Sequence, residues 1–210
     1  MYIDTLFCEE FFEGICFFLI FCLFTFYPTK VFSEGFSFDD IQQEWGKFAL
    51  GFVGGIAAHE VGHCVVAISK GYRVGHDGLS IIYPGAVLSD SNHLQLASAG
   101  IQTQWLLTEL ALRNSRGKES KEPIGSFSAG IVSAHLGITL AYLTILKDHK
   151  QGDIAGIATS TGLTNNQVAL ILSVPAVLDA WRLFGTQVPE WVPHLSLLTK
   201  GVGVVRVWTY

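Results

Sequence analysis

The stretch that decides the fold is Phe48–Ser69, which reads FALGFVGGIAAHEVGHCVVAIS. Glu60 is the only charged side chain between Lys47 and Lys70 if the histidines are counted as neutral. An α-helix needs roughly 20 consecutive, mostly apolar residues to cross the hydrocarbon core of a bilayer. The stretch therefore predicts a membrane-spanning helix.

The same stretch contains the pattern H-E-x-x-H, from His59 to His63. Residues four apart lie on one face of a helix, so the two imidazoles can bind one zinc ion. Glu60 is rotated away from this pair, where its carboxylate would act as a general base on a zinc-bound water. Chance occurrence is the alternative, but three ionisable groups in an apolar helix would be costly unless they had a function. We therefore expect a metal site here.

The composition favours a membrane protein. Half of the 210 residues are hydrophobic and only 15% are charged, whereas soluble domains carry about 25% charged residues. We expect an integral, multi-pass protein in contact with the lipid bilayer. The net charge of −5 and the scattered basic residues argue against a nucleic-acid partner. The four cysteines form no C-x-x-C pair, so we expect neither a disulfide framework nor a cysteine zinc site.

The N-terminal residues 1–33 permit two interpretations. Their apolar run, Ile15–Tyr27, is short for a span and typical of a signal-peptide core, but acidic residues precede it where a signal peptide carries basic ones. A signal peptide and a first transmembrane helix both remain open. Residues 34–47 are predicted to be a juxtamembrane linker, 48–188 an intramembrane metalloprotease-like core, and 189–210 a C-terminal tail without an assigned element.

A small β-hairpin is predicted after the metal-binding helix. Gly71–Val74 and Leu79–Tyr83 look like short strands joined through a glycine-rich turn. The hairpin could offer an edge strand to an extended substrate, or it could be an ordinary interfacial loop. The fold class expected is an all-α polytopic membrane helix bundle carrying this hairpin. Further helices are predicted at Leu94–Leu112, Ile124–Leu146 and Val168–Phe184, with a short piece at Asp153–Ser160 and a capping box at Thr164–Gln167.

A catalytic zinc ion normally has three protein ligands and one open position. Asp179 is the first candidate for the third ligand, because it stands inside the last apolar helix one turn after the helix-breaking Pro175. Asp179 could instead pair with Arg182, three residues further on. Glu109 is the next candidate. Other candidates are His135, Asp153 and His93.

The chain resembles a known family in these motifs. H-E-V-G-H in an apolar helix, the hairpin after it and the distal P-x-x-L-D sequence are similar to those of site-2 proteases, which are intramembrane zinc metalloproteases. The resemblance covers mainly residues 48–85 and 167–185, and Ala180 stands where the family usually has glycine. It implies that His59, His63 and Asp179 bind Zn²⁺ and that Glu60 is the base.

The function expected is that of a zinc-dependent intramembrane endopeptidase that hydrolyses peptide bonds of membrane-associated proteins. Its substrate would be a membrane protein, with His135 and Tyr83 as candidate substrate-contacting residues. His135 could equally be a packing residue. The alternative is a non-proteolytic metal-binding or scaffold membrane protein that keeps the protease fold.

Overall fold

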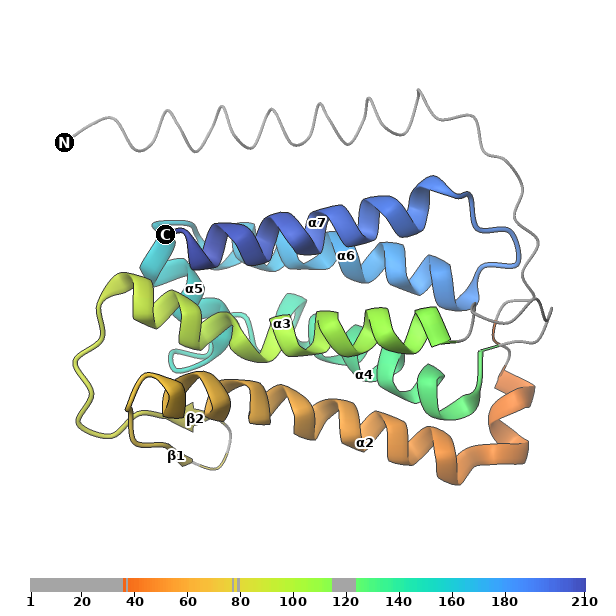
Figure 1. Cartoon of the computed structure of the whole chain (residues 1–210), viewed down its shortest axis with the longest axis horizontal. Coiled ribbons are helices and arrows are strands. Elements are labelled where there is room, and N and C mark those ends of the chain that lie inside the picture. The colour runs from red at the N-terminus through yellow and green to blue at the C-terminus, as the bar shows by residue number, and fades with distance from the viewer. Residues whose placement is uncertain (1–35, 37, 77, 79, 115–123) are drawn as a thin grey trace.

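The computed structural model of the chain describes residue 36 and residues 38–76, 78, 80–114 and 124–210. The segment 1–33, predicted as a signal peptide or a first helix, lies outside the described residues. Within them the protein is a bundle of helices with one two-stranded antiparallel sheet (Figure 1). The elements are α2 (Phe38–Ser69), β1 (Gly75–His76), β2 (Ile81–Ile82), α3 (Asp90–Asn114), α4 (Ser126–Leu143), α5 (Asp153–Thr161), α6 (Asn165–Phe184) and α7 (Trp191–Trp208).

The predicted metal-binding helix is confirmed as part of α2. The helix begins earlier than expected, at Phe38, so part of the predicted linker 34–47 is helical. A kink at Glu44, where φ is −131° and ψ is 35°, separates its first turns from the apolar part, Glu44–Ser69. The long helices alternate in direction, because α2, α4 and α7 run one way while α3 and α6 run the other (Figure 1).

Glycines bring α2 and α4 close together. A Cβ atom on Gly51 would lie 2.1 Å from the carbonyl oxygen of Phe127, and one on Gly130 would lie 2.2 Å from that of Phe48. Gly55, one turn after Gly51, faces Ala134 in the same way. Small residues four apart allow helix backbones to approach closely, which is how membrane helices commonly pack. Gly51 and Gly55 therefore form the face of α2 that packs against α4.

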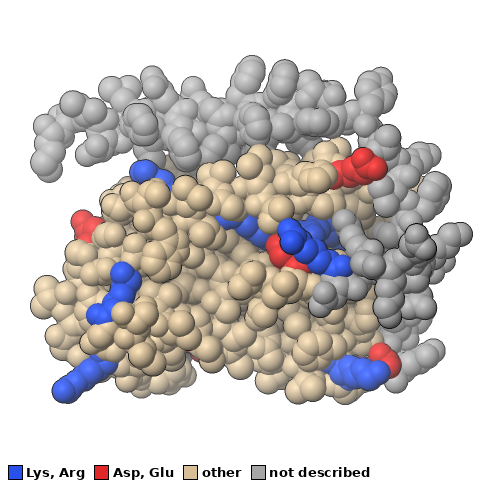
Figure 2. All heavy atoms as spheres, in the orientation of Figure 1, with Lys and Arg blue, Asp and Glu red and all other residues tan. Residues whose placement is uncertain are grey.

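The bundle is apolar on its outside. Among the residues that the structure describes, three helices are long and apolar enough to cross a membrane, namely Glu44–Ser69, Ser126–Leu143 and Asn165–Phe184. Charged side chains are sparse on the face of the molecule drawn in Figure 2. Such a surface suits lipid better than water. Large apolar side chains exposed on these helices include Leu50, Val53, Val61, Val65, Ile68, Leu140, Leu170 and Val177.

Other sequence predictions are met in part. The hairpin exists, but its first strand is Gly75–His76, which we expected in the turn, and Gly71–Val74 is not a strand. The capping box is confirmed, since Thr164 and Gln167 hydrogen bond reciprocally at the start of α6. Pro175 does not break α6, which continues through it to Phe184. The predicted tail 189–210 contains α7, which packs along α3 and α6.

Candidate metal centre

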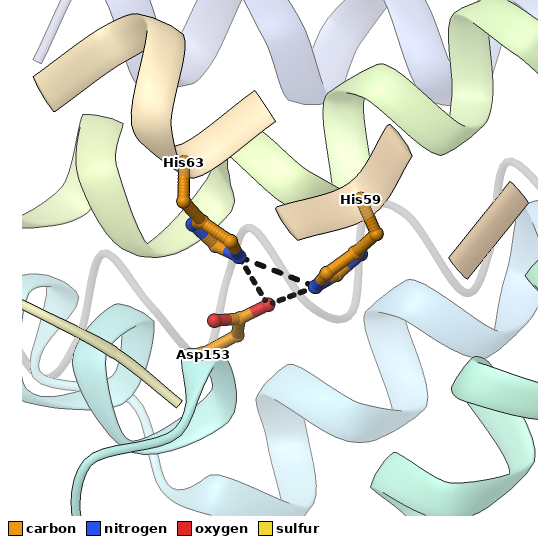
Figure 3. A group of neighbouring side chains, drawn as sticks. All are labelled: His59, His63 and Asp153. Carbon is orange, nitrogen blue, oxygen red and sulfur yellow. Dashed lines mark hydrogen bonds and ion pairs between the residues drawn. The ribbon is translucent and has the colours of Figure 1, made fainter. Parts of the chain in front are cut away.

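Two histidines and one aspartate meet inside the bundle. The Nε2 atoms of His59 and His63 lie 3.2 Å apart, and Oδ2 of Asp153 is 3.0 Å from the first and 3.3 Å from the second (Figure 3). Both histidines are buried, with 4% of each exposed, while Asp153 is partly buried. Each residue directs one ligand atom at the same point, so the group could hold a metal ion.

The spacing of the three atoms fits one small ion. Ligand atoms at 2.0–2.1 Å from a tetrahedral zinc ion lie about 3.3–3.4 Å from one another. The observed separations of 3.0, 3.2 and 3.3 Å are close to that value. The ion would therefore need only small side-chain movements, and one coordination position would remain for a water molecule or a substrate.

The outer nitrogen of His63 fixes the orientation of its ring. Nδ1 of His63 lies 2.7 Å from the carbonyl oxygen of Leu96 in α3, so this nitrogen carries the proton and donates it. The lone pair of Nε2 is then directed at the shared point, as in many zinc sites. Nδ1 of His59 is buried and has no hydrogen-bond partner among the described atoms.

Gly100 in α3 leaves room for both rings. A Cβ atom at this position would lie 2.5 Å from Nε2 of His59 and 2.5 Å from Nε2 of His63. The adjacent Gly62 of α2 packs in turn on Ala99 and Thr103 of α3. Close contact between α2 and α3 therefore depends on glycine from each helix.

Asp153 is the first residue of α5 and follows the N-cap residue Gly152. Its Oδ2 atom accepts a hydrogen bond of 2.5 Å from the hydroxyl of Tyr142 in α4. Burial alone would raise the pKa of the Asp153 carboxyl, but the imidazoles of His63 and His59 hold that pKa well below its usual range. The carboxylate is therefore ionised at neutral pH, as a metal ligand must be.

A cavity of about 240 Å³ opens beside the three residues. A water molecule occupies about 30 Å³ of liquid, so the cavity has room for several. The hairpin and the connection between α4 and α5 contribute to its lining. Its wall includes Glu60, Ser80, Ile81, Tyr83, His149 and Lys150.

Asp179, which the resemblance implied as the third ligand, is not in this group. It is fully buried, and its carboxylate accepts hydrogen bonds from Arg182 at 2.8 Å, Ser196 at 2.7 Å and Lys200 at 2.5 Å. Glu109, the next candidate, is in the same cluster, where it binds Arg182 through two hydrogen bonds and Lys200 through one. We call Glu109, Asp179, Arg182 and Lys200 the ionic quartet. The pairing of Asp179 with Arg182 is the alternative that the sequence had left open.

The helix directions explain why Asp153 and not Asp179 joins the histidines. The end of α2 and the start of α6 lie at the same end of the bundle (Figure 1). His63 is about 9 Å along α2 from that end, whereas Asp179 is about 21 Å along α6 from it, at 1.5 Å per residue. Asp153 begins a short helix at that same end, and so it reaches the level of His63.

The remaining candidate residues lie either at the cavity or beside the ionic quartet. Tyr83 and His93 line the cavity beside Glu60. Burial, and then the charge of Asp153, raise the pKa of the Tyr83 hydroxyl, which therefore stays protonated and can donate a hydrogen bond. His135 is buried in α4, and its Nε2 lies 3.7 Å from Oδ2 of Asp179. It does not line the cavity.

Sequence reasoning missed Tyr142, Ser196 and Lys200 as parts of these clusters. Tyr142 carried one usable signal, a hydroxyl near the end of a predicted apolar helix and a short distance before Asp153. Lys200 carried another, a cation in the middle of a segment rich in valine and leucine. Neither signal shows which residue Tyr142 or Lys200 would bind.

No family model matches the chain, and no curated protein or solved structure matches it. The candidate function therefore rests on the geometry of the chain's own residues.

Proposed function

We propose that the protein is a zinc-dependent endopeptidase of the membrane, with His59, His63 and Asp153 as metal ligands and Glu60 as general base. The observation that carries the proposal is the convergence of the three ligand atoms, 3.0–3.3 Å apart, on the wall of a cavity that Glu60 also lines. The resemblance of the motifs to those of site-2 proteases supports it. The ligand set proposed differs from that of the family in its third member.

The chemistry of the donors favours zinc. Two imidazoles from an H-E-x-x-H helix and a carboxylate from another segment are a ligand set typical of zinc hydrolases. A site with three protein ligands keeps one coordination position open. Zinc bound here would act as a Lewis acid on the scissile carbonyl and would make water more acidic.

Glu60 supplies the proton transfers. Glu60 follows His59 in the chain and is one of the residues that line the cavity. It accepts one proton from the water that attacks the peptide carbonyl, and it then returns this proton to the nitrogen as the carbon–nitrogen bond breaks. The second proton of the attacking water also passes to the released nitrogen, so the products are a carboxylate and a protonated amine, and Glu60 is ionised again at the end.

The substrate proposed is a membrane-associated segment in extended conformation. A helical segment keeps its backbone amides hydrogen bonded, so it must unwind locally before water can attack a carbonyl. Ile81 of β2 lines the cavity, and the sheet formed by the described residues has two strands, so an extended segment could pair along its edge. The Tyr83 hydroxyl, a donor in the same wall, could hydrogen bond to a substrate carbonyl or to the developing oxyanion.

A multi-pass arrangement is part of the proposal. The apolar exterior of the three long helices and the polar interior suit a protein embedded in lipid. The cavity reaches the polar connection His149–Gly152, through which water could enter from one side of the membrane.

Replacing the base tests the function. We expect Glu60→Gln to bind as much zinc per mole as the wild type while losing all cleavage. Membrane fractions from cells expressing each protein would be compared for new peptide termini, and zinc would be measured on the purified proteins. Glu190→Gln is the matched control, because Glu190 is exposed and makes no cap hydrogen bond before α7.

New termini in equal number for Glu60→Gln and wild type would refute the mechanism. Bound zinc without any cleavage by the wild type would instead favour the non-proteolytic alternative, a membrane protein that binds metal.

A further inference from the structure

The hydroxyl of Tyr142 lies beside the metal group and contacts two of its ligand atoms. Its oxygen is 2.5 Å from Oδ2 of Asp153 and 3.1 Å from Nε2 of His59. These are the same two atoms that converge with Nε2 of His63. Tyr142 therefore contacts two of the three ligand atoms directly, although it comes from a different helix than either.

The direction of the hydrogen bond follows from the chemistry of the groups. An ionised carboxylate only accepts, so the single proton of the Tyr142 hydroxyl is donated to Asp153. Hydrogen bonds from a hydroxyl to a carboxylate are among the short, strong ones. The bond thus selects which carboxylate oxygen of Asp153 faces the imidazoles.

Tyr142 is held rigidly enough to impose this choice. Its ring is buried in a cluster of apolar side chains contributed mainly by α3, α5 and α6. Asp153, by contrast, follows a connection of turns and bends from Thr144 to Gly152. A rigid donor therefore constrains an acceptor at the end of an irregular segment. The cluster includes Leu94, Ala97, Ile101, Trp105, Ile154 and Leu172.

We propose that Tyr142 is a positioning residue that orients Asp153 for metal binding. The inference rests on the proposed metal centre but assigns a role to a residue outside its ligand set. Hydrogen-bond partners of metal ligands typically contribute 10- to 100-fold to metal affinity. Without the hydroxyl, Asp153 rotates more freely, so the affinity for zinc should fall by about 10- to 100-fold.

Tyr142→Phe removes the hydroxyl and keeps the ring in its apolar cluster. The matched control is Tyr72→Phe, because the Tyr72 hydroxyl accepts a hydrogen bond of 3.0 Å from Asn92 and does not line the cavity. The full-length proteins, purified in detergent, would be titrated with zinc against a chelator of known affinity. The absorption spectrum of bound Co²⁺ would report the ligand geometry. Thermal unfolding without metal would show whether each variant folds.

A double-mutant cycle separates positioning from general stability. If Tyr142 acts through Asp153, adding Tyr142→Phe to Asp153→Asn should weaken binding of the metal no further. We expect Tyr72→Phe to match the wild type and Tyr142→Phe to bind zinc about 10- to 100-fold more weakly with an altered Co²⁺ spectrum.

Equal affinity and an unchanged spectrum in Tyr142→Phe would overturn the inference and leave the proposed function standing. Additive losses in the cycle would overturn it as well. A wild type that binds no zinc would overturn both proposals, whereas a zinc-binding wild type without cleavage would count only against the peptidase.

Discussion

Adding one methyl group at Gly100 should weaken metal binding strongly, because it takes up space that both histidines occupy. The Cβ atom of Gly100→Ala would lie 2.5 Å from Nε2 of His59 and from Nε2 of His63. Ordinary contacts with carbon are about 3.5 Å or longer. Both imidazoles would therefore have to move by about 1 Å, or α2 would have to separate from α3 by a similar amount.

A displacement of that size exceeds what a metal site tolerates. Ligand distances in working sites lie within about 0.2 Å of their ideal values. We therefore expect the zinc affinity of Gly100→Ala to fall by more than about 100-fold. Removing a hydrogen-bond partner of a metal ligand usually lowers the affinity by about 10- to 100-fold. The cost in unfolding free energy is smaller, about 1–3 kcal/mol for overpacking, and the better helix propensity of alanine offsets up to about 1 kcal/mol of it.

Gly54→Ala is the matched control. Gly54 is on α2, in the turn before His59, and a Cβ atom there would meet nothing within 4 Å. This variant should bind zinc as the wild type does and should unfold at the same or a slightly higher temperature. Zinc would be counted per mole after gel filtration in detergent, and the affinity would be obtained by chelator competition. Wild-type affinity in Gly100→Ala would refute the packing argument for the site.

Two further predictions concern the acidic residues and the ionic quartet. Asp153→Asn should weaken zinc binding strongly. Asp179→Asn should keep the zinc but lower the unfolding temperature, since unpairing a buried ion costs about 3–5 kcal/mol. The opposite pattern in zinc titrations would make Asp179 the ligand. Lys200→Met should destabilise the bundle by a similar amount, about 3–5 kcal/mol, because it leaves Glu109 and Asp179 with one cation, Arg182. Adding Glu109→Gln to Lys200→Met should recover part of the loss in thermal unfolding, and an unchanged unfolding temperature in Lys200→Met would contradict the account.

The ionic quartet shows how a bundle with an apolar exterior can hold charges. Two carboxylates and two cations cancel one another, and their bonds link α3, α6 and α7. Removing a charge from water is costly unless it is paired and hydrogen bonded. The quartet thus accounts for Lys200 and its neighbour Ser196 in α7, the segment that the sequence left unassigned.

Much of the local structure could be read from the chain. The helix Phe48–Ser69, the hairpin after it, the capping box at Thr164 and the short helix at Asp153 all follow from patterns within a few residues of one another. The pairing of His59 with His63 is equally local, because the α-helix itself puts residues four apart on one face. Short-range geometry is the same in almost any tertiary context, and this is why such predictions succeed.

The third member of the metal group could not be chosen in this way. The sequence is compatible with Asp153, Asp179 or Glu109 as the third ligand. The choice depends on how far along the bundle axis each carboxylate lies from the two histidines. That distance is set by the close approach of α2 to α4 at Gly51 and Gly130, and by the direction in which α6 returns.

The sequence by itself determined the apolar helix, its two histidines and the glutamate beside them, since one turn of backbone relates all three. Only the tertiary structure decided that Asp153 and Tyr142 complete the group while Asp179 pairs with Arg182 and Lys200. Those partners are separated from one another by up to tens of residues along the chain. Their meeting depends on how whole helices pack and on the cost of leaving any buried charge unpaired.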